Sequence, residues 1–312
     1  MQRRTFITGA LAATATIAAG GCAALSAGRD DSIIDIHQHT KYGGRSEEEL
    51  IAHQWNMGVA RTILLPSGRA MRTASTHHGE ANGLQAAAGG NESCFEMARK
   101  FPRLFYFAAN EVPDATDAER QIEKYLKLGG VAIAEQKFAV ECDSPAMQRL
   151  YRMAADYNVP ILMHWEHGRF NYGFERFHSM LAKHPRTIFI GHAQTWWANI
   201  GKEHENQAVL YPKANVEPGG LTDRYLSDYP NMFGDLSAGS GLNSLTRDEE
   251  HAREFLRRHQ DKLLYGSDCN DKAGSGSACL GWRIIQAVRK LAPDEGIRRK
   301  IFRANARKVF RL

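Results

Sequence analysis

The sequence predicts a (β/α)₈ barrel. Eight short apolar runs alternate with helix-like segments after residue 28, and strands covered on both faces of a parallel sheet are typically continuous apolar runs. Residues 29–312 also suffice for one such barrel, which typically has about 250 residues. A doubly wound open sheet is the main alternative, but no Gly-rich phosphate loop follows the first run. We therefore predict a single barrel domain over residues 29–312.

The expected strands are short runs rich in Val, Ile, Leu and Phe, bounded by polar or turn residues. Their length is typical of strands rather than of helices. They cover residues 32–36, 60–65, 104–108, 131–138, 159–163, 187–191, 232–236 and 262–266.

Helix-like segments fill intervals between these runs, and several begin with a capping signal. Ser46 precedes three glutamates, and Asp143 or Ser144 is the expected cap ahead of Pro145, a residue that suits the first turn of a helix. Thr246 stands ahead of an Asp-Glu pair in the same way. The expected helices cover residues 47–56, 92–100, 115–128, 144–157, 174–183 and 247–258, with a terminal helix over 293–312.

Two connections exceed the usual loop length of about 4–6 residues. Residues 66–90 follow the second expected strand, and residues 192–218 follow the sixth. Barrel enzymes build their active sites from loops at the carboxyl ends of the strands, so we expect both connections to form pocket walls. Surface insertions without a role are the alternative. We assign Arg69 and Trp196, one from each connection, to substrate binding.

Residues 1–28 have the features of an export signal. Arg3 and Arg4 begin a twin-arginine pattern, and the rest of the segment is uncharged and rich in Ala, Thr and Gly. This modest apolarity suits a signal better than a permanent membrane helix. Cys22 follows Ala-Gly-Gly, which resembles a lipoprotein cleavage box; cleavage of a plain signal near Ala27 is the alternative. We expect a periplasmic protein exported through the twin-arginine route, and a lipid anchor on Cys22 is a further hypothesis.

The composition is that of a soluble globular protein, with 43% apolar and 24% charged residues and a formal net charge of +5. No Lys/Arg cluster with interleaved aromatics stands out, so we expect a small-molecule substrate and no nucleic acid. Apart from Cys22, four cysteines form no CxxC pair, and we predict no disulfide. A homodimer is a further hypothesis.

Metal-binding side chains stand at the ends of several expected strands. His37 and His39 end the first strand, and their i, i+2 spacing puts both imidazoles on the same side. His164 ends the fifth strand, His192 the sixth, and Asp268 follows the eighth. In a barrel all these ends meet at one mouth. The sequence therefore predicts a site for a divalent cation of the zinc type.

The fourth expected strand carries two more polar candidates. Strict alternation puts Glu135 and Lys137 on one face and Ala132 and Ala134 on the other. Small alanines suit contact with the outer helices, so we expect Glu135 and Lys137 to face the barrel mouth. There Glu135 is a candidate metal ligand, and Lys137 is a candidate for binding a substrate carboxylate. The alternative is that the two side chains pair with each other.

The pattern of ligands resembles the amidohydrolase superfamily, in its branch related to aminocarboxymuconate semialdehyde decarboxylase. The resemblance covers residues 33–312 and is carried by the HxH of the first strand. It is also carried by the phrases Pro-Ile-Leu-Met-His, Ile-Gly-His and Tyr-Gly-Ser-Asp at residues 160–164, 190–192 and 265–268.

This resemblance implies a divalent metal, for which zinc is the expectation, with Asp268 also accepting the proton of a metal-activated water. At the position of His192, relatives polarise the substrate or nucleophile, or bind a second metal. Related families place a Glu or a carboxylated Lys on strand four to bridge two metals, so Glu135 leaves one and two ions open. The implied ligands are His37, His39, His164 and Asp268.

We therefore expect an exported hydrolase that cleaves the C–O or C–N bond of a lactone, ester or amide with metal-activated water. Non-oxidative decarboxylation of a small carboxylic acid on the same site is the alternative, and Glu135 favours hydrolysis. A metal-binding lipoprotein without turnover is a third hypothesis. Asp268 argues against it, because a storage site needs no proton acceptor beside the metal.

Overall fold

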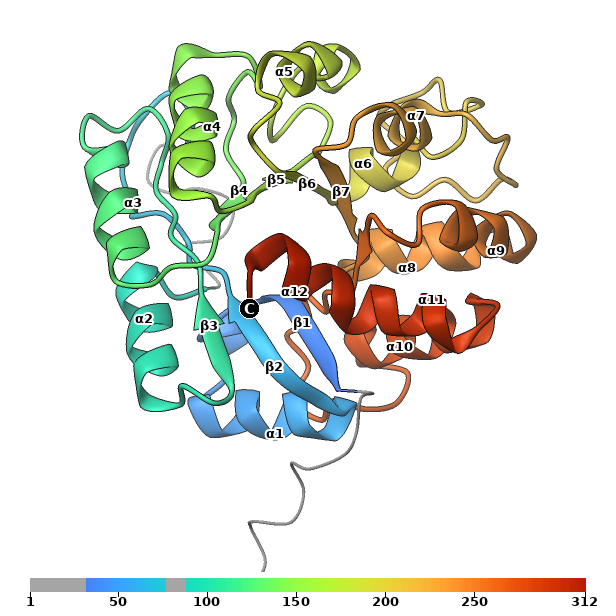
Figure 1. The fold of residues 1–312 in the computed structure, drawn as a ribbon, viewed down its shortest axis with the longest axis horizontal. Coiled ribbons are helices and arrows are strands. Elements are labelled where there is room, and N and C mark those ends of the chain that lie inside the picture. Colours follow the sequence, from blue (N-terminus) through green and yellow to red (C-terminus); the bar gives the residue numbers. More distant parts are fainter. Residues whose placement is uncertain (1–31, 77–87) are drawn as a thin grey trace, which may run out of the picture. The chain divides into compact units, whose positions relative to one another are not determined.

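Consecutive strands pair in parallel around a barrel (Figure 1). The computed structural model describes residues 32–76 and 88–312, and the predicted export segment with Cys22 lies outside them. The strands are β1 (Ile33–Gln38), β2 (Val59–Leu64), β3 (Phe105–Phe107), β4 (Ile133–Gln136), β5 (Ile161–His164), β6 (Phe189–His192), β7 (Met232–Asp235) and β8 (Leu263–Leu264). Each of the eight lies within or next to its expected run.

Backbone hydrogen bonds join the sets β1–β3 and β4–β8, which confirms the predicted (β/α)₈ barrel. Between the sets, the Ala109 N–H donates to the Ala132 carbonyl at 2.8 Å, and the Ala109 carbonyl accepts from the Ala134 N–H at 3.0 Å. The barrel closes on its other side through bonds from Ile36 N–H to Tyr265 (3.1 Å) and from Asp268 N–H to His37 (2.8 Å).

Helices cover the outside of the strands (Figure 1). The expected terminal helix is divided into two α-helices by a π-helical segment, Lys300–Ala304, and the expected helix 174–183 begins with a separate 3₁₀ turn, Phe174–Arg176. The helices are α1 (Glu47–Met57), α2 (Asn91–Lys100), α3 (Ala118–Lys127), α4 (Pro145–Tyr157), α5 (His178–Lys183), α6 (Gln194–Ala198), α7 (Leu221–Asp228), α8 (Ala238–Thr246), α9 (Glu249–Arg258), α10 (Leu280–Leu291), α11 (Glu295–Arg299) and α12 (Asn305–Phe310).

Helix starts follow the capping chemistry of the sequence. Ser46 and Glu49 form a capping box, in which the Glu49 N–H donates to the Ser46 hydroxyl at 3.2 Å and the Ser46 N–H donates to the Glu49 carboxylate at 2.9 Å. Ser144 caps α4 as expected, whereas α9 is capped by Asp248 rather than by Thr246. Within the described residues, no helix is both long enough and apolar enough to cross a membrane.

The strands separate an interior apolar cluster from an outer one that packs against the helices. Along β1, Ile34 and Ile36 belong to the interior cluster, and Ile33 belongs to the outer one. The period of two therefore holds at the start of this strand. The interior cluster is completed by residues in or directly after the other strands, including Ile63, Leu65, Ala108, Leu162, Ile190, Phe233 and Leu264.

The last helix, α12, closes the amino end of the barrel. Val309 and Phe310 belong to the interior cluster, and the Asn305 side-chain amide donates to the carbonyl of Leu263, the first residue of β8, at 2.8 Å. Figure 1 accordingly shows α12 and the carboxyl terminus within the ring of strands.

Strand β4 departs from the alternation expected for it. Ala132 and Ala134 belong to the interior cluster, and Ile133 packs in the outer one, so the expectation that the alanines face the helices is wrong. Glu135 nevertheless lies at the barrel mouth with the histidines. The register between β4 and β5 shifts between Ile133 and Gln136, and such an irregularity redirects a side chain.

Asp223 on α7 ties this helix to the end of α9. Its Oδ1 lies 2.6 Å from His259 Nε2 and accepts from the Arg258 guanidinium at 2.9 Å. Burial raises the pKa of Asp223, but the hydrogen bonds from His259 and Arg258 outweigh burial and hold this pKa below its usual value. The folded chain therefore favours the ionised carboxylate.

We predict that Asp223→Asn lowers the free energy of unfolding at pH 7 by about 1–3 kcal/mol, the range for hydrogen bonds to charged groups. Because the pKa of Asp223 is lower in the folded than in the unfolded chain, this contribution is complete above about pH 4 and is lost as the pH falls through the folded-state pKa. Urea unfolding between pH 7 and pH 2 should show the difference shrinking. Asp228→Asn, at an exposed position of α7, is the control, and a difference independent of pH would contradict the prediction.

Candidate metal centre

Five side chains at the carboxyl ends of the strands bring metal-binding atoms together in two overlapping groups, which share His37. In the described part of the chain these atoms are buried and have no hydrogen-bond partner. Unpartnered buried polar atoms are costly, and several around one point indicate a bound cation. The atoms are His37 Nε2, His39 Nε2, Glu135 Oε2, His192 Nε2 and Asp268 Oδ1; we call these five residues the donor cluster.

The distances within the donor cluster suit a single divalent ion. Glu135 Oε2 lies 3.5 Å from His37 Nε2 and 3.6 Å from His39 Nε2. Asp268 Oδ1 lies 3.8 and 3.5 Å from the same two nitrogens. Two ligand atoms that are each about 2.1 Å from a zinc ion at a tetrahedral angle are about 3.4 Å apart. The donor cluster is therefore close to ligand geometry.

Contacts on the far side of each imidazole ring direct its Nε2 inward. His39 Nδ1 donates to the Leu65 carbonyl at 2.7 Å, which leaves Nε2 as the nitrogen with a free lone pair. His37 Nδ1 lies 2.7 Å from Asp235 Oδ2, and His192 Nδ1 lies 3.0 Å from Ser237 Oγ. Carboxylates and carbonyls behind ligating histidines commonly set the tautomer and the ring orientation in this way.

Between the two histidines of β1, Gln38 points away from the donor cluster. Its amide group donates to Ser267 Oγ and to the Cys269 carbonyl, both at 2.9 Å. These bonds fix β1 to the segment after β8. His37, His39 and Asp268 are therefore held in one arrangement by the closure of the barrel.

The carboxylates of the donor cluster are ionised. Burial raises the pKa of Asp268, but the nearby charges of His37 and His39 outweigh burial and lower this pKa to about 2. Burial likewise raises the pKa of Glu135, but the charges of His164 and Lys137 and the hydrogen bond between Glu135 Oε1 and His164 lower it well below its usual value. The donor cluster thus carries negative charge that a cation would balance.

The pKa values of His37 and His192 are shifted in opposite directions. Burial lowers the pKa of His37, yet the charges of Asp268 and Asp235 outweigh burial and raise it well above its usual value. Burial, helped by the charge of His37, lowers the pKa of His192. Without a cation, His37 is therefore the ring that takes up a proton, and a metal ion at the same point would replace that proton.

His164, one of the predicted metal ligands, lies beside the donor cluster rather than in it. Its Nδ1 is 2.5 Å from Glu135 Oε1, and its Nε2 is 3.4 Å from Glu166 Oε2. Two ligands of one ion at bond lengths of about 2.1 Å stay at least about 3 Å apart. The structure therefore leaves no room for an ion between His164 Nδ1 and Glu135.

The predicted substrate-binding residues occupy different environments. The Lys137 ammonium lies 5.5 Å from the centre of the Phe170 ring, and its charge acts on Glu135. The Arg69 guanidinium is bound by Glu111 and Asp117, each at 2.5 Å.

Trp196 has no exposed surface and packs in the outer apolar cluster. Its ring contacts Gly191 so closely that a Cβ there would lie 2.4 Å from it. In this structure Trp196 thus presents no face to a substrate.

Sequence reasoning gave no role to three residues that surround the donor cluster. Asp235 and Ser237 are buried behind His37 and His192; their position around the end of β7 was the available signal. Tyr42, three residues after His39, lies with its ring centre 5.0 Å from that of His39. The nearby Asp268 carboxylate, with burial, raises the pKa of the Tyr42 hydroxyl, so this hydroxyl keeps its proton and is a hydrogen-bond donor at the mouth.

With this geometry established, comparison with known proteins identifies the family. The chain matches the amidohydrolase family over residues 34–312. It belongs to the amidohydrolase family. The predicted superfamily is thereby confirmed, and this amidohydrolase is an enzyme rather than a metal-binding protein without turnover. A search of curated proteins finds no match.

Solved structures share the barrel of this amidohydrolase at low sequence identity. A probable 2-pyrone-4,6-dicarboxylic acid hydrolase from Acinetobacter baumannii, solved with citric acid bound, is 12% identical with a TM-score of 0.59 (90% of this chain and 100% of that chain covered). The 5-carboxyvanillate decarboxylase from Sphingomonas paucimobilis is 13% identical with a TM-score of 0.56 (90% and 99%). A dihydroxybenzoic acid decarboxylase from Polaromonas sp., with manganese and 2-nitroresorcinol bound, is 13% identical with a TM-score of 0.55 (90% and 97%). These similarities show the shared fold.

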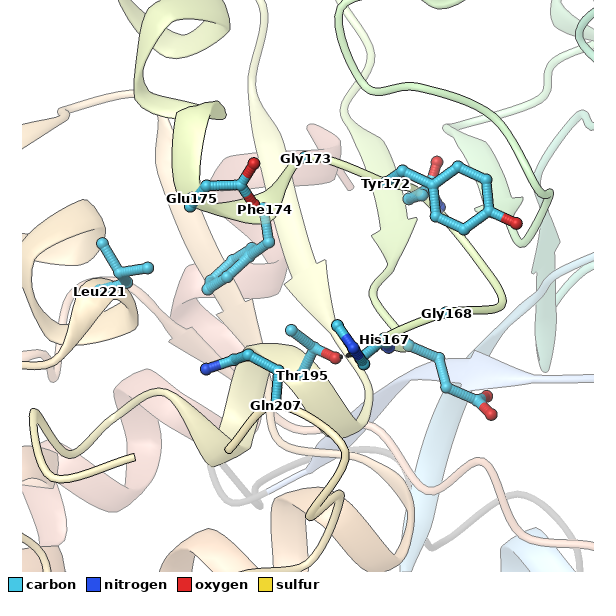
Figure 2. A pocket seen from close by; sticks show the side chains of 11 residues that line it. His167, Gly168, Tyr172, Gly173, Phe174, Glu175, Thr195, Gln207 and Leu221 are labelled. Atoms are coloured by element: carbon cyan, nitrogen blue, oxygen red, sulfur yellow. Dashed lines mark hydrogen bonds between the residues drawn. The ribbon is translucent and has the colours of Figure 1, made fainter. Parts of the chain in front are cut away.

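A cavity of about 410 Å³ lies among residues of the segments after β5 and β6 (Figure 2). Glu166, which faces His164 Nε2, is part of its lining. Figure 2 shows Phe174 on one side of the cavity and Thr195 and Gln207 on the other. Thr195 and Gln207 belong to the long connection 192–218, which therefore lines this cavity, whereas none of the five residues of the donor cluster is part of its lining. The other long connection, 66–90, includes residues 77–87, which lie outside the described part.

We predict that Asp235→Asn weakens metal binding by about 10–100-fold, the usual effect of removing a carboxylate behind a ligating histidine. The asparagine oxygen can still accept from His37 Nδ1, but the negative charge that makes the ring a better ligand is lost. Competition with a chromogenic chelator measures the affinity. Asp261→Asn, which alters a carboxylate that is 65% exposed, should bind metal like the parent chain, and equal weakening in both variants would contradict the assignment.

Proposed function

We propose that this amidohydrolase is a metal-dependent hydrolase that cleaves the C–O or C–N bond of a lactone, ester or amide. The position of Asp268 carries the proposal. Its side chain is 13% exposed, whereas those of His37, His39, Glu135 and His192 are only 0 or 1% exposed. Substrate and water therefore approach the donor cluster from the side of Asp268, whose ionised carboxylate can accept a proton.

The donor cluster is proposed to hold one divalent ion, with zinc as the first candidate. Three imidazole nitrogens and two carboxylate oxygens suit zinc better than magnesium or calcium, which prefer oxygen ligands. When bound, the ion supplies Lewis acidity that polarises a substrate carbonyl and acidifies water. The contact between Glu135 and His164 speaks against a second ion bridged by Glu135.

Asp268 is proposed to take the proton from the attacking water and to return it to the leaving oxygen or nitrogen. Its Oδ2 lies 3.7 Å from His192 Nε2. Because the pKa of His192 is lowered by burial, this ring stays neutral at neutral pH. Asp268 is then the group at the exposed edge of the donor cluster that gains and loses the proton.

Lys137 supports a substrate with an anionic group. In the described part of the chain no ion pair of Lys137 is found within 4.0 Å, and its charge lies close enough to Glu135 to lower the pKa of that carboxyl. An ammonium group beside a metal site can hold a substrate carboxylate through charge-assisted hydrogen bonds.

Non-oxidative decarboxylation is the second candidate, and the position of Lys137 near Glu135 favours it as well. Two of the solved structures with this fold are decarboxylases of aromatic acids. In that reaction Lys137 would help to hold the substrate, and a proton carried by Asp268 would go to the carbon that loses carbon dioxide. The two candidates therefore share residues and differ in product.

We predict that Asp268→Asn lowers kcat/KM for the hydrolysed substrate by at least about 10²-fold, the contribution typical of a positioned general base. Activity is measured by acid release on a panel of lactones, esters and amides, with and without carboxylate groups. In parallel, carbon dioxide release is measured on aromatic carboxylic acids. Asp261→Asn controls for the loss of an exposed carboxylate.

The expected result is acid release by the parent chain and by Asp261→Asn, without carbon dioxide, and loss of acid release in Asp268→Asn. Carbon dioxide release without hydrolysis would contradict the proposed hydrolase function and support the decarboxylase function. Full hydrolytic activity in Asp268→Asn would contradict the proposed role of Asp268 as the proton acceptor.

We also propose export through the twin-arginine route with a lipid anchor on Cys22, on the sequence of residues 1–28. Replacing Arg3 and Arg4 by lysine should retain the chain in the cytoplasm, and Cys22→Ser should move it from the membrane fraction to the soluble periplasm. Cell fractionation with immunoblotting measures both effects. If the parent chain, the variant with lysine at positions 3 and 4, and Cys22→Ser were found in the same cell fractions, export by this route would be contradicted.

A further inference from the structure

A second group of metal-binding side chains lies outside the donor cluster. His53 on α1, Cys269 and Asp271 after β8, and Cys279 at the start of α10 bring four ligand atoms within 4.8 Å of one another. We call these four residues the thiol cluster. The proposed hydrolysis uses none of them, and the sequence analysis gave the cysteines no role.

Two of the distances in the thiol cluster are those of a tetrahedral metal site. Two sulfur ligands about 2.3 Å from zinc lie about 3.8 Å apart at a tetrahedral angle, and a sulfur and a nitrogen ligand lie about 3.5 Å apart. The Sγ atoms of Cys269 and Cys279 are 3.8 Å apart, and Cys279 Sγ is 3.5 Å from His53 Nε2. Asp271 Oδ2 is the fourth ligand atom and lies farther out, at 4.0 Å from His53 Nε2.

The thiol cluster is sealed from solvent except at Asp271. Cys269, Cys279 and His53 are 2, 0 and 0% exposed, and the Asp271 side chain is 17% exposed. The two sulfur atoms are much farther apart than the roughly 2.05 Å of a disulfide bond. Their separation instead leaves space for an ion between them and the imidazole.

The segment between β8 and α10 is long and irregular, and hydrogen bonds to β1 and α1 hold parts of it. Residues 265–279 contain no helix or strand, and loops of this length are uncommon in compact domains unless they are held by other contacts. The segment begins beside Asp268 and ends at the start of α10. An ion bound by the thiol cluster would join both ends of this segment to α1.

Hydrogen bonds link the thiol cluster to the residues that present the donor cluster. Gln38, between the two histidines of β1, donates to the Cys269 carbonyl at 2.9 Å, and the Arg45 guanidinium donates to the Asp271 carbonyl at 2.8 Å. Cys269 directly follows Asp268 in the chain. The backbone that carries Asp268 is therefore continuous with the backbone of the thiol cluster.

We propose that the thiol cluster is a second, structural metal site for a zinc-type ion, with two thiolates, one imidazole and one carboxylate as ligands. A closed set of four protein ligands is typical of structural zinc sites, which contribute to folding rather than to turnover. The ion holds the segment after β8 and thereby the position of Asp268. This inference does not depend on which reaction the donor cluster catalyses.

Cobalt(II) distinguishes the two sites, because thiolate ligands give an intense sulfur-to-metal absorption in the near ultraviolet that imidazole and carboxylate ligands do not give. We expect the parent chain to bind two cobalt ions and to show this band. His37→Ala should lose one ion and keep the band. Cys279→Ala and His53→Ala should each lose one ion, and the band should be lost with it in both variants. Cys94→Ala, which removes another fully buried free thiol, should keep both ions and the band.

A second measurement needs no variant. Alkylation of Cys269 and Cys279 in the folded parent chain, followed by mass spectrometry, should be slowed at least about tenfold by zinc relative to the chelator-treated chain, because metal-bound thiolates react only after release. Alkylation of Cys94 after denaturation serves as the internal standard.

Absence of the sulfur band from the parent chain and from His37→Ala, or its full persistence in Cys279→Ala, would overturn the proposal. So would a Cys269–Cys279 disulfide in metal-free protein purified without reductant, or alkylation rates that zinc does not change. Loss of hydrolysis with an intact sulfur band would instead count against the proposed function alone.

Discussion

Three buried, ionised carboxylates at the mouth of the barrel require a positive charge among them, and the rest of the structure depends on this requirement. The carboxylates of Glu135, Asp235 and Asp268 lie around the same imidazoles, with side-chain exposures of 1, 0 and 13%. Burial favours their neutral forms, yet hydrogen bonds and neighbouring histidines keep all three pKa values low. Such an arrangement is stable only with a positive charge at its centre. A proton on His37 meets that requirement in part, and a divalent ion meets it fully.

The closure of the barrel and the assembly of the donor cluster depend on the same contacts. The Ser267 hydroxyl and N–H donate to Asp35 at 2.5 and 2.9 Å, which joins the segment after β8 to β1. His37 and Asp268 are neighbours across that seam, through a backbone bond of 2.8 Å. A change that loosens the seam therefore moves ligands as well as strands, so stability and metal binding should change together in this region.

Sequence reasoning predicted the barrel well because its signals are local and repeated. Apolar runs and caps such as Ser46 report on neighbours in the chain, and the superfamily phrases placed histidines at strand ends. The side chains behind the ligands were not assigned roles, since nothing in the local sequence of Asp235 or Ser237 shows that they meet His37 and His192. Periodicity also failed on β4, where a register shift decides which way Glu135 points.

The thiol cluster illustrates the same limit. Cys269 and Cys279 are ten residues apart and His53 is more than two hundred residues earlier, so no spacing rule connects them. Only the packing of α1 and α10 around the end of β8 brings them together. The long connection 192–218 was recognisable by its length, but Trp196, which was assigned to substrate binding, is packed in the core, because burial of a large ring depends on the final fold.

The position of α12 bears on the stability of the barrel. Val309 and Phe310 fill the amino end of the barrel interior, and Asn305 binds the first residue of β8. Removal of α12 would therefore expose apolar interior side chains to water at the end of the barrel opposite to the donor cluster.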